Sequence, residues 1–308
     1  MGRGDLSDAE WERLRPFLPV SNGRCGRWRD HRQVIDGILH RVRTGFQWRD
    51  LPERFGPWKT VYERHRLWSA DGAWERLLQQ VQAAADAAGE IDWDVSVDST
   101  IVRTHQKRGR GPHRPAPGSR VKGGRTARTP GRGSMAEPRR PPGGGGAGGE
   151  GLGRSRGGFT TKLHLSADGR CRPLSLIVTP GQRADCTQFE PVLEKIRVPR
   201  IGPGRPRKKP DSLAADKAYS NGPCREYLRR RGIRHTIPEK TDSQAARVRK
   251  GPRGGRPPDF DEERYKKRNT VERAINRLKH ARAVATRYDG YVFLGTATAA
   301  ALVIWLRT

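Results

Sequence analysis

The sequence has no hydrophobic run long enough to cross a bilayer. Its most apolar stretch, Val292 to Leu306, is about fifteen residues long, whereas a transmembrane helix needs roughly twenty. We predict that this stretch is a buried helix. The first residues, Met1 to Trp11, are charged and lack the apolar segment of a secretory signal, so neither export nor membrane insertion is expected.

Paired cysteines are also missing. The chain has four scattered cysteines, Cys25, Cys171, Cys186 and Cys224. Because they form no C-x-x-C pair, neither a zinc site nor a disulfide framework is predicted, and a reducing cytoplasm fits. Four of the histidines are interpreted as structural or incidental, namely His40, His105, His164 and His235.

Acidic residues are few relative to basic ones. The chain has 62 Lys and Arg against 33 Asp and Glu, which gives a formal net charge of +29. Such a charge lies outside the range of ordinary cytosolic enzymes and favours a polyanion partner, most simply a nucleic acid. Charge alone leaves RNA packing and a polybasic membrane patch as alternatives.

The region from Leu6 to Gly89 has the pattern of helices. A capping box, Ser7-x-x-Glu10, begins the first helix, and Gly45 ends the second. Leu51 to Ala70 resembles a helix-turn-helix with its turn at Gly56-Pro57. In this motif Trp58, Val61 and Trp68 are expected to face inward, and Lys59, Arg64, His65 and Arg66 to surround them. A plain helical bundle with a solvated basic face is the alternative.

After Gly89 the pattern changes to strands. Ile91, Trp93, Val95 and Val97 alternate with Asp92, Asp94, Ser96 and Asp98. A β-hairpin is predicted from Phe159 to Val178 with its turn at Asp168-Gly169, followed by alternating helices and strands. The expected fold class is therefore α/β, with a mixed sheet flanked by helices.

One segment lacks the large apolar residues that folding needs. Gln106 to Gly153 is rich in Arg, Gly and Pro, and from Arg103 to Arg156 the only acidic residues are Glu137 and Glu150. We predict a disordered basic insertion at 106–153 that interrupts the β-containing domain. Such a loop would lie readily along a phosphate backbone, and a solvated linker is the alternative.

Two aspartates follow short apolar strands. Asp98 comes directly after Val95–Val97, and Asp216 comes directly after Leu213–Ala215. A carboxylate at the edge of an apolar element is costly unless a cation or partner is present. Both positions match the strand ends at which open sheets build their sites, although each could also cap a helix.

A third acidic residue, Glu272, lies on a predicted helix. At about 100° per residue, Tyr265, Arg268, Glu272 and Lys279 share a stripe about 60° wide. The apolar residues Val271, Ala274, Ile275, Leu278 and Ala281 form the adjoining face, which should pack on the sheet. A metal-binding carboxylate beside phosphate-binding donors would suit the handling of DNA strands, whereas the alternative is a solvated helix edge.

Three gathered carboxylates would repel one another without metal. Two Mg²⁺ ions about 3.5–4 Å apart would activate a water or a 3′-hydroxyl and stabilise the leaving oxygen. Strand cleavage and strand joining are the same displacement at phosphorus with different nucleophiles. One such site could therefore perform both reactions.

Several motifs together resemble one family. They are Gly45-Phe46-Gln47-Trp48-Arg49-Asp50-Leu51-Pro52, Val97-Asp98-Ser99-Thr100, Gly153-Arg154-Ser155-Arg156-Gly157-Gly158, Ala215-Asp216-Lys217-Ala218-Tyr219, and Tyr265-x₂-Arg268-x₃-Glu272-x₆-Lys279. Over nearly the whole chain they resemble bacterial insertion-sequence transposases of the RNase H-like DDE superfamily, insertion-sequence-five group. The last motif is the most specific.

The resemblance implies an all-helical DNA-binding domain at 1–90 and an RNase H-like catalytic domain at 91–308. It implies that Asp98, Asp216 and Glu272 are catalytic metal ligands, for two Mg²⁺ ions with Mn²⁺ able to substitute. Tyr265, Arg268 and Lys279 would contact transposon-end DNA. The implied partners are double-stranded DNA, as terminal inverted repeats and target, and a second copy of the chain in a homodimer on that DNA; no membrane partner is expected. The expected location is the bacterial cytoplasm, at the nucleoid.

Three alternatives remain open at this stage. The chain could be a catalytically decayed transposase that only binds DNA, since the connection at 106–153 is longer and more biased than the family usually has. It could be an RNase H-like nuclease, against which the helical N-terminal region argues. It could also be a basic packing protein, for which the grouping of Glu272 with Tyr265, Arg268 and Lys279 would be accidental.

Overall fold

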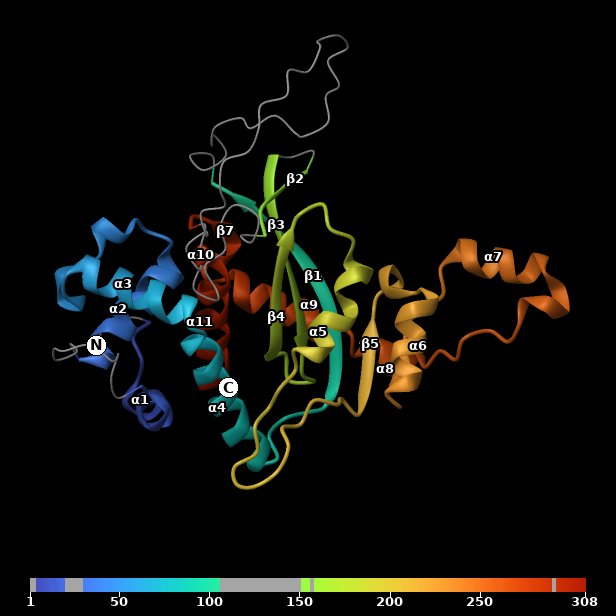
Figure 1. Cartoon of the computed structure of the whole chain (residues 1–308), viewed down its shortest axis with the longest axis horizontal. Helices are drawn as coiled ribbons and strands as arrows, with labels where there is room; N and C mark the ends of the chain where they lie inside the picture. Colours follow the sequence, from blue (N-terminus) through green and yellow to red (C-terminus); the bar gives the residue numbers. More distant parts are fainter. Residues whose placement is uncertain (1–3, 20–29, 106–150, 156–157, 290–291) are drawn as a thin grey trace, which may run out of the picture.

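The computed structural model describes residues 4–19, 30–105, 151–155, 158–289 and 292–308. A sheet lies at the centre, the N-terminal helices lie on one side of it, and a group of later helices lies on the other (Figure 1). Most of the predicted insertion at 106–153, and Cys25, fall outside the described residues. The last residue of that predicted range, Gly153, begins a strand.

The N-terminal region is helical, as predicted. Its helices are α1 (Asp8–Leu14), α2 (His31–Thr44), α3 (Trp58–Ala70) and α4 (Ala73–Ala87), with the short turn η1 (Arg15–Phe17) after α1. Both halves of the capping box form, because the Ser7 side chain accepts from Glu10 N and the Glu10 side chain accepts from Ser7 N. Gly45 ends α2 with a positive φ of 72°, which glycine adopts without strain.

The helix-turn-helix prediction is wrong in its first helix. Residues 48–55 form two single 3₁₀ turns, η2 (Trp48–Asp50) and η3 (Glu53–Phe55), before α3 begins. Pro52 and Pro57 bracket η3, and Gly56 has a φ of 80°, so too few residues remain for an α-helix. Only the second helix of the predicted motif exists.

Two of the basic residues expected to surround the inward-facing side chains of this motif lie inside the fold. His65 is fully buried and Arg64 is nearly so. His65 Nε2 lies 3.1 Å from Thr296 Oγ1, and Trp74 Nε1 donates to His65 Nδ1 at 3.1 Å. Burial lowers the pKa of His65 to about 3, so the ring is neutral. The C-terminal helix covers this face of α3, which no local pattern reveals.

The sheet is mixed, as predicted. Its strands are β1 (Asp94–Thr104), β2 (Gly153–Ser155), β3 (Gly158–Ala167), β4 (Pro173–Pro180), β5 (Ser212–Ala215), β6 (Arg234–Thr236) and β7 (Thr286–Arg287). β4, β3 and β1 pair antiparallel, and β1, β5 and β6 pair parallel. β2 extends the pairing along β3, and β7 pairs with the end of β1. The predicted hairpin is the β3–β4 pair.

Helices cover both faces of the sheet. The remaining elements are η5 (Asp185–Gln188), α5 (Phe189–Glu194), η6 (Lys217–Tyr219), α6 (Gly222–Arg230), α7 (Thr241–Arg249), η7 (Gly251–Gly254), α8 (Glu262–Lys266), α9 (Asn269–Lys279), α10 (Arg282–Ala285) and α11 (Phe293–Leu306). The α9 residue Thr270 hydrogen-bonds Ser96, whereas α5 accepts a bond from Ser175 through Val192 O. Since Ser96 and Ser175 point to opposite faces in the strand register, α9 and α5 lie on opposite sides.

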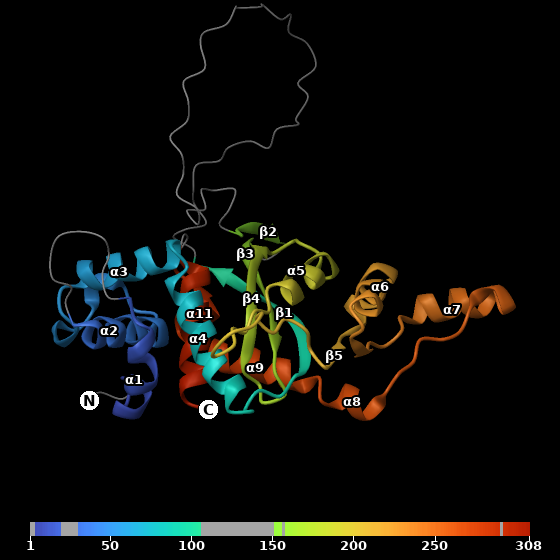
Figure 2. The same ribbon diagram turned by 60° about the horizontal axis from the view of Figure 1, so that its bottom comes forward.

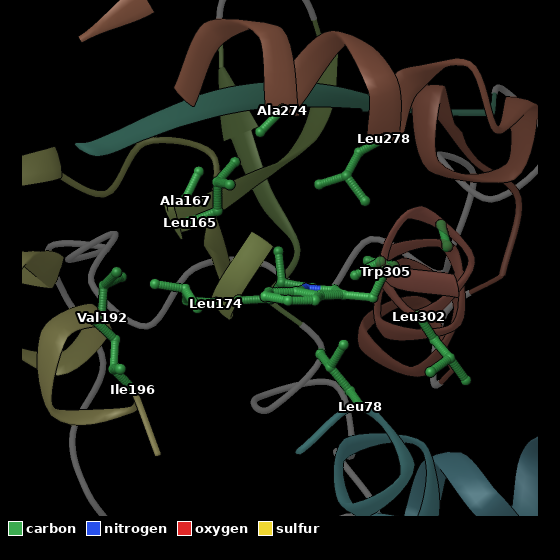
Figure 3. Close-up of a cluster of buried hydrophobic side chains, with 14 of the residues drawn as sticks. Leu78, Leu165, Ala167, Leu174, Val192, Ile196, Ala274, Leu278, Leu302 and Trp305 are labelled. Atoms are coloured by element: carbon green, nitrogen blue, oxygen red, sulfur yellow. The ribbon is translucent and has the colours of Figure 1, made fainter. Parts of the chain in front are cut away.

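The apolar C-terminal stretch is a buried helix, as predicted. α11 packs between α4 and β4, and Figure 3 shows Trp305 in the cluster with Leu78, Leu174 and Leu302 around it. The Trp305 indole N–H donates to Pro173 O at 2.7 Å. One continuous core therefore joins the N-terminal helices to the sheet. No helix in the described part of the chain is long and apolar enough to cross a membrane.

The segment around α7 projects from the rest of the chain. Figure 2 shows α7 at the far end of an arm that leaves the sheet after β6 and returns through α8. α7 has no buried residue, and Val248 on it is 67% exposed. This arm therefore contributes little to the core.

Candidate active site

Asp98 and Asp216 lie next to each other on neighbouring strands. The parallel pairing of β1 with β5 ends at Val97 opposite Ala215, and each aspartate is the next residue. Neighbouring strands are about 5 Å apart, so the two carboxylates emerge side by side. The prediction that Asp98 lies at a strand end is wrong, because β1 continues to Thr104 through its pairing with β3.

Glu272 reaches the same place from α9. The Arg268 guanidinium donates to Glu272 Oε1 at 2.5 Å and to Asp98 Oδ2 at 3.4 Å. It therefore bridges the helix carboxylate and the strand carboxylate. The predicted apolar face of this helix is confirmed within α9, since Val271, Ala274, Ile275 and Leu278 are buried. The fifth predicted member, Ala281, lies beyond the end of α9 and is partly buried against the core.

The predicted single helix from Tyr265 to Lys279 is wrong. Tyr265 lies on α8, and α9 begins only after Arg268. Backbone hydrogen bonds run from Arg268 N to Tyr265 O and from Val271 N to Arg268 O. Each joins residues three positions apart, so the chain has 3₁₀ geometry between the two helices. Tyr265 therefore lies outside α9, and its ring centre is 5.7 Å from the Arg268 guanidinium carbon.

Lys279 lies farther from the acidic cluster than the other predicted residues. It is the last residue of α9, seven residues beyond Glu272, which corresponds to about 10 Å along the helix axis. The structure thus brings together Asp98, Asp216, Glu272 and Arg268, with Tyr265 at the edge of the cluster.

The acidic cluster is electrostatically strained. Burial raises the pKa of Asp98, and the negative charges of Asp216 and Glu272 raise it further. The Ser99 backbone N–H, which donates to Asp98 at 2.7 Å, and the charge of Arg268 oppose this rise. The ionised form of Asp98 is therefore disfavoured by its surroundings, and any positive charge close to it, such as that of Arg268, favours it.

The donor set of this cluster fits a hard divalent cation. Carboxylate oxygens are the ligands that Mg²⁺ prefers, and the three acids come from the interior of β1, the residue after β5 and α9. Within the described ranges no three His, Cys, Asp or Glu side chains lie close enough together to hold an ion as they stand. Arg268 lies between Asp98 and Glu272, so its guanidinium occupies part of the space a cation would take.

A fourth carboxylate, Asp185, was not among the predicted site residues. Its Oδ1 atom accepts from Ser99 Oγ at 2.6 Å and lies 3.0 Å from Lys162 Nζ. In the strand register Ser99 points to the opposite face of β1 from Asp98. Asp185 therefore holds β1 on the face opposite to Asp98, through the residue that directly follows Asp98. Its only sequence signal is a position at the start of a helix, which many aspartates share.

Two further buried side chains lie near Asp185. His164 Nδ1 lies 3.8 Å from Asp185 Oδ1, and burial lowers the pKa of His164 to about 4, so its ring is neutral. The predicted structural role of His164 fits its bond to Thr179 Oγ1 at 2.8 Å. The hydroxyl of Tyr219 is buried nearby, and burial together with the charges of Asp185 and Asp98 raises its pKa.

Asp185→Asn is expected to weaken Mg²⁺ binding and to lower stability by a similar amount. Asparagine keeps the shape but removes the charge that holds Lys162 and the Ser99 hydroxyl, so the strand that carries Asp98 is held less firmly. The free energy of unfolding should fall by about 1–3 kcal/mol, the usual effect of losing a hydrogen bond to a charged group. The affinity for Mg²⁺ in a direct binding titration should fall about tenfold, as when a group that orients a metal ligand is lost.

The control for this prediction is Asp211→Asn, which removes the exposed partner of Arg207. It should change neither quantity. An unchanged Mg²⁺ affinity in Asp185→Asn would reduce the role of Asp185 to packing.

Two family models match the chain. Residues 6–78 match the model described as "putative transposase of IS4/5 family", and residues 91–306 match the model described as "transposase DDE domain". The second match alone covers more than half of the chain. The chain belongs to the DDE transposase family. The resemblance predicted from the sequence motifs is thereby confirmed.

Two curated relatives are similar to parts of this chain. An uncharacterized protein of Sinorhizobium fredii is 37% identical over 124 residues, which are 40% of this chain and 90% of that protein. A "putative transposase for insertion sequence element IS6501" of Brucella ovis is 29% identical over 151 residues, 48% of this chain and all of that protein. The crystal structure of a pre-cleavage Mos1 transpososome aligns over 94% of this chain and 82% of that one, at 9% identity and a TM-score of 0.22, an overlap too low to support an argument.

Membership of this family makes the protein a transposase, an enzyme that acts on DNA. DDE transposase domains generally use divalent metal ions, in agreement with the oxygen donors of the acidic cluster.

Proposed function

We propose that this transposase binds the terminal inverted repeats of an insertion sequence and catalyses cleavage and transfer of its strands at Asp98, Asp216 and Glu272. The observation that supports it most directly is the end of the β1–β5 pairing, where Asp98 and Asp216 emerge together, with Arg268 linking Asp98 to Glu272. The three acids come from segments far apart in sequence. They meet where two neighbouring interior strands of the sheet stop pairing, which is where open sheets build their sites.

The three carboxylates would hold two Mg²⁺ ions, with Mn²⁺ able to replace them. Bound metal would supply a nucleophilic oxygen at neutral pH and stabilise charge on the leaving oxygen. The protein's own contribution is to hold three acids on rigid elements in spite of their mutual repulsion. Asp98 pairs with Leu165 of β3, and the residue before it pairs with β5, so its backbone is held in the sheet against the repulsion of the charges.

Arg268 has two roles in this proposal. In the metal-free protein it offsets the charges of Asp98 and Glu272. With the acids neutralised by metal, the guanidinium would be available to a phosphate beside the cut, since it matches phosphate geometry well. Tyr265 would lie against the same DNA segment. Lys279, about two turns of α9 beyond Glu272, would contact the DNA backbone.

The helical region at 1–90 would bind the terminal repeats, and residues 91–308 would form the catalytic domain. Pairing two element ends would require a second copy of the chain, so a homodimer on DNA is proposed. The substrate DNA would place the protein at the nucleoid of a bacterial cell. The net charge of +29 supplies the electrostatic attraction to both element and target DNA.

The direct test is to map strand breaks in a duplex that carries the element's terminal repeat. Purified full-length protein would be incubated with that duplex in the presence of Mg²⁺ or EDTA. Breaks at the repeat boundary that require metal support the proposal. Binding without breaks would favour a decayed transposase, and breaks without preference for the repeat would favour a general nuclease.

Arg268→Ala is expected to weaken binding to cleavage-ready DNA in Mg²⁺ by one phosphate contact. The slope of log affinity against log salt should become shallower by about 0.9. The matched control is Arg273→Ala, because Arg273 is an exposed arginine on the same helix. If the slope of log affinity against log salt is the same for wild type and Arg268→Ala, Arg268 does not contact a phosphate of the bound DNA.

A further inference from the structure

A cavity lined by aromatic rings lies away from the acidic cluster. Its volume is about 600 Å³. It opens between α3 with the turn that precedes it and the segment that follows β7. Six rings line it, Phe46, Trp48, Trp58, Tyr62, His105 and Tyr288. They come from three parts of the sequence, which the fold brings together where β1 and β7 end beside the N-terminal helices (Figure 1).

These rings differ from the aromatic rings of the core. Trp74 and Trp305 are buried, and each indole N–H has an acceptor. At the cavity Phe46 is 54% exposed, and the buried Trp48 indole N–H has no hydrogen-bond partner within the described ranges. Exposed rings and unmet donors both cost stability, so their concentration around one hollow is typical of a binding site.

Arg41 supplies a buried cation in the cavity wall. It is only 3% exposed, and its guanidinium carbon lies 5.2 Å from the ring centre of Trp48 and 5.6 Å from that of Tyr288. Its Nη2 atom donates to Asp289 at 2.9 Å, whereas its Nε atom has no partner among the residues that the structure describes. The wall therefore combines flat π surfaces, hydrogen-bond donors and a carboxylate acceptor.

We propose that this cavity binds one nucleobase of the element's DNA, taken out of the base stack. A base is a flat π system with donors and acceptors on its edge, and proteins recognise unstacked bases through aromatic rings, arginine planes and edge hydrogen bonds. The volume lies within the range of small-ligand pockets. The inference rests on the proposed binding of terminal repeats, and it adds a contact that the acidic cluster does not provide.

The position of the cavity sets which base it receives. His105 follows the end of β1, seven residues beyond Asp98, which corresponds to about 23 Å along a strand. At about 3.4 Å per base pair this distance spans roughly seven base pairs of duplex. The captured base would therefore lie inside the repeat, several pairs from the cut, and would help to set the register of the cut.

The test compares how a protein variant and wild type bind duplex DNA from which a single base has been removed. Duplexes carrying the terminal repeat would be made with a single abasic site at each position in turn, and their affinity for the full-length protein would be measured by fluorescence anisotropy. Phe46→Ala should weaken binding of the intact duplex by about fivefold to a hundredfold, the range that stacking on one base provides. On the duplex that lacks the captured base, Phe46→Ala should bind as tightly as wild type.

Two further variants define the outcome. Tyr62→Leu changes a second ring of the wall and should show the same position dependence, whereas Leu67→Ala removes an exposed apolar side chain of α3 outside the cavity and should have no effect. Since Phe46 is mostly exposed, its variant should keep the melting temperature of wild type.

The possible failures are distinguishable. If wild type binds the repeat but Phe46→Ala and Tyr62→Leu weaken every duplex equally or none, the base-binding inference is wrong, and a protein contact at the cavity becomes the better explanation. If wild type shows no preference for the repeat over unrelated duplex, the proposed end-binding function fails together with the inference.

Discussion

Asp98→Asn is expected to abolish DNA cleavage while DNA binding is retained. The substitution removes one negative charge from the three acids that would hold metal, and it also reduces repulsion of the phosphate backbone. Cleavage of a terminal-repeat duplex in Mg²⁺ should fall by about a thousandfold or more, as when one group that stabilises the transition state is lost. Affinity for the same duplex should be equal to wild type or tighter.

The same variant carries its own control for folding. Because burial and the neighbouring acids raise the pKa of Asp98, the ionised form destabilises the metal-free fold. That cost is absent at low pH and develops as pH rises from the unfolded to the folded pKa, so at neutral pH the neutral asparagine should not lower the melting temperature in EDTA. Retained cleavage in a folded Asp98→Asn protein would refute the assignment of the triad.

Asp168→Ala should produce the largest loss of stability. Asp168 and Arg172 are 0% and 1% exposed, and the carboxylate accepts from Arg172 Nε at 2.8 Å and Nη2 at 2.7 Å, and from the backbone N–H groups of Arg170 and Arg172. Its removal leaves Arg172 buried without its counter-charge, against the ring of Trp305. A loss of about 3–5 kcal/mol in the free energy of unfolding is expected, measured by urea denaturation.

The matched comparison is Asp211→Ala. Asp211 forms an i,i+4 pair with Arg207 at 2.8 Å, but this pair is partly exposed, and such pairs contribute at most about 1 kcal/mol. A loss below about 1 kcal/mol for Asp168→Ala would mean that Arg172 finds other partners or water. The stability of the β3–β4 turn would then rest mainly on its apolar contacts.

Several features followed from local patterns. The capping box at Ser7 and Glu10, the alternation that leads to Asp98 and the apolar stretch of α11 each depend on residues within one or two turns or along one strand. The β3–β4 hairpin has the same origin. Asp216 was placed correctly at the end of its strand for the same reason, because the apolar run before it is short and uninterrupted.

Other features depend on contacts between distant segments. His65 is buried because α11, more than two hundred residues later, packs against it, which the local pattern of α3 does not reveal. The break between Tyr265 and Arg268 was missed because helical propensity continues through it, whereas the backbone tightens there. The sequence by itself determined most of the helices and strands, the positions of the acidic residues along them and the family, since these depend on local periodicity and motif spacing. Only the tertiary structure decided that Arg268 bridges two of the acids, that Asp185 holds β1 on the face opposite to Asp98 and that six aromatic rings surround one cavity, because each arises where long-range packing brings separate segments together.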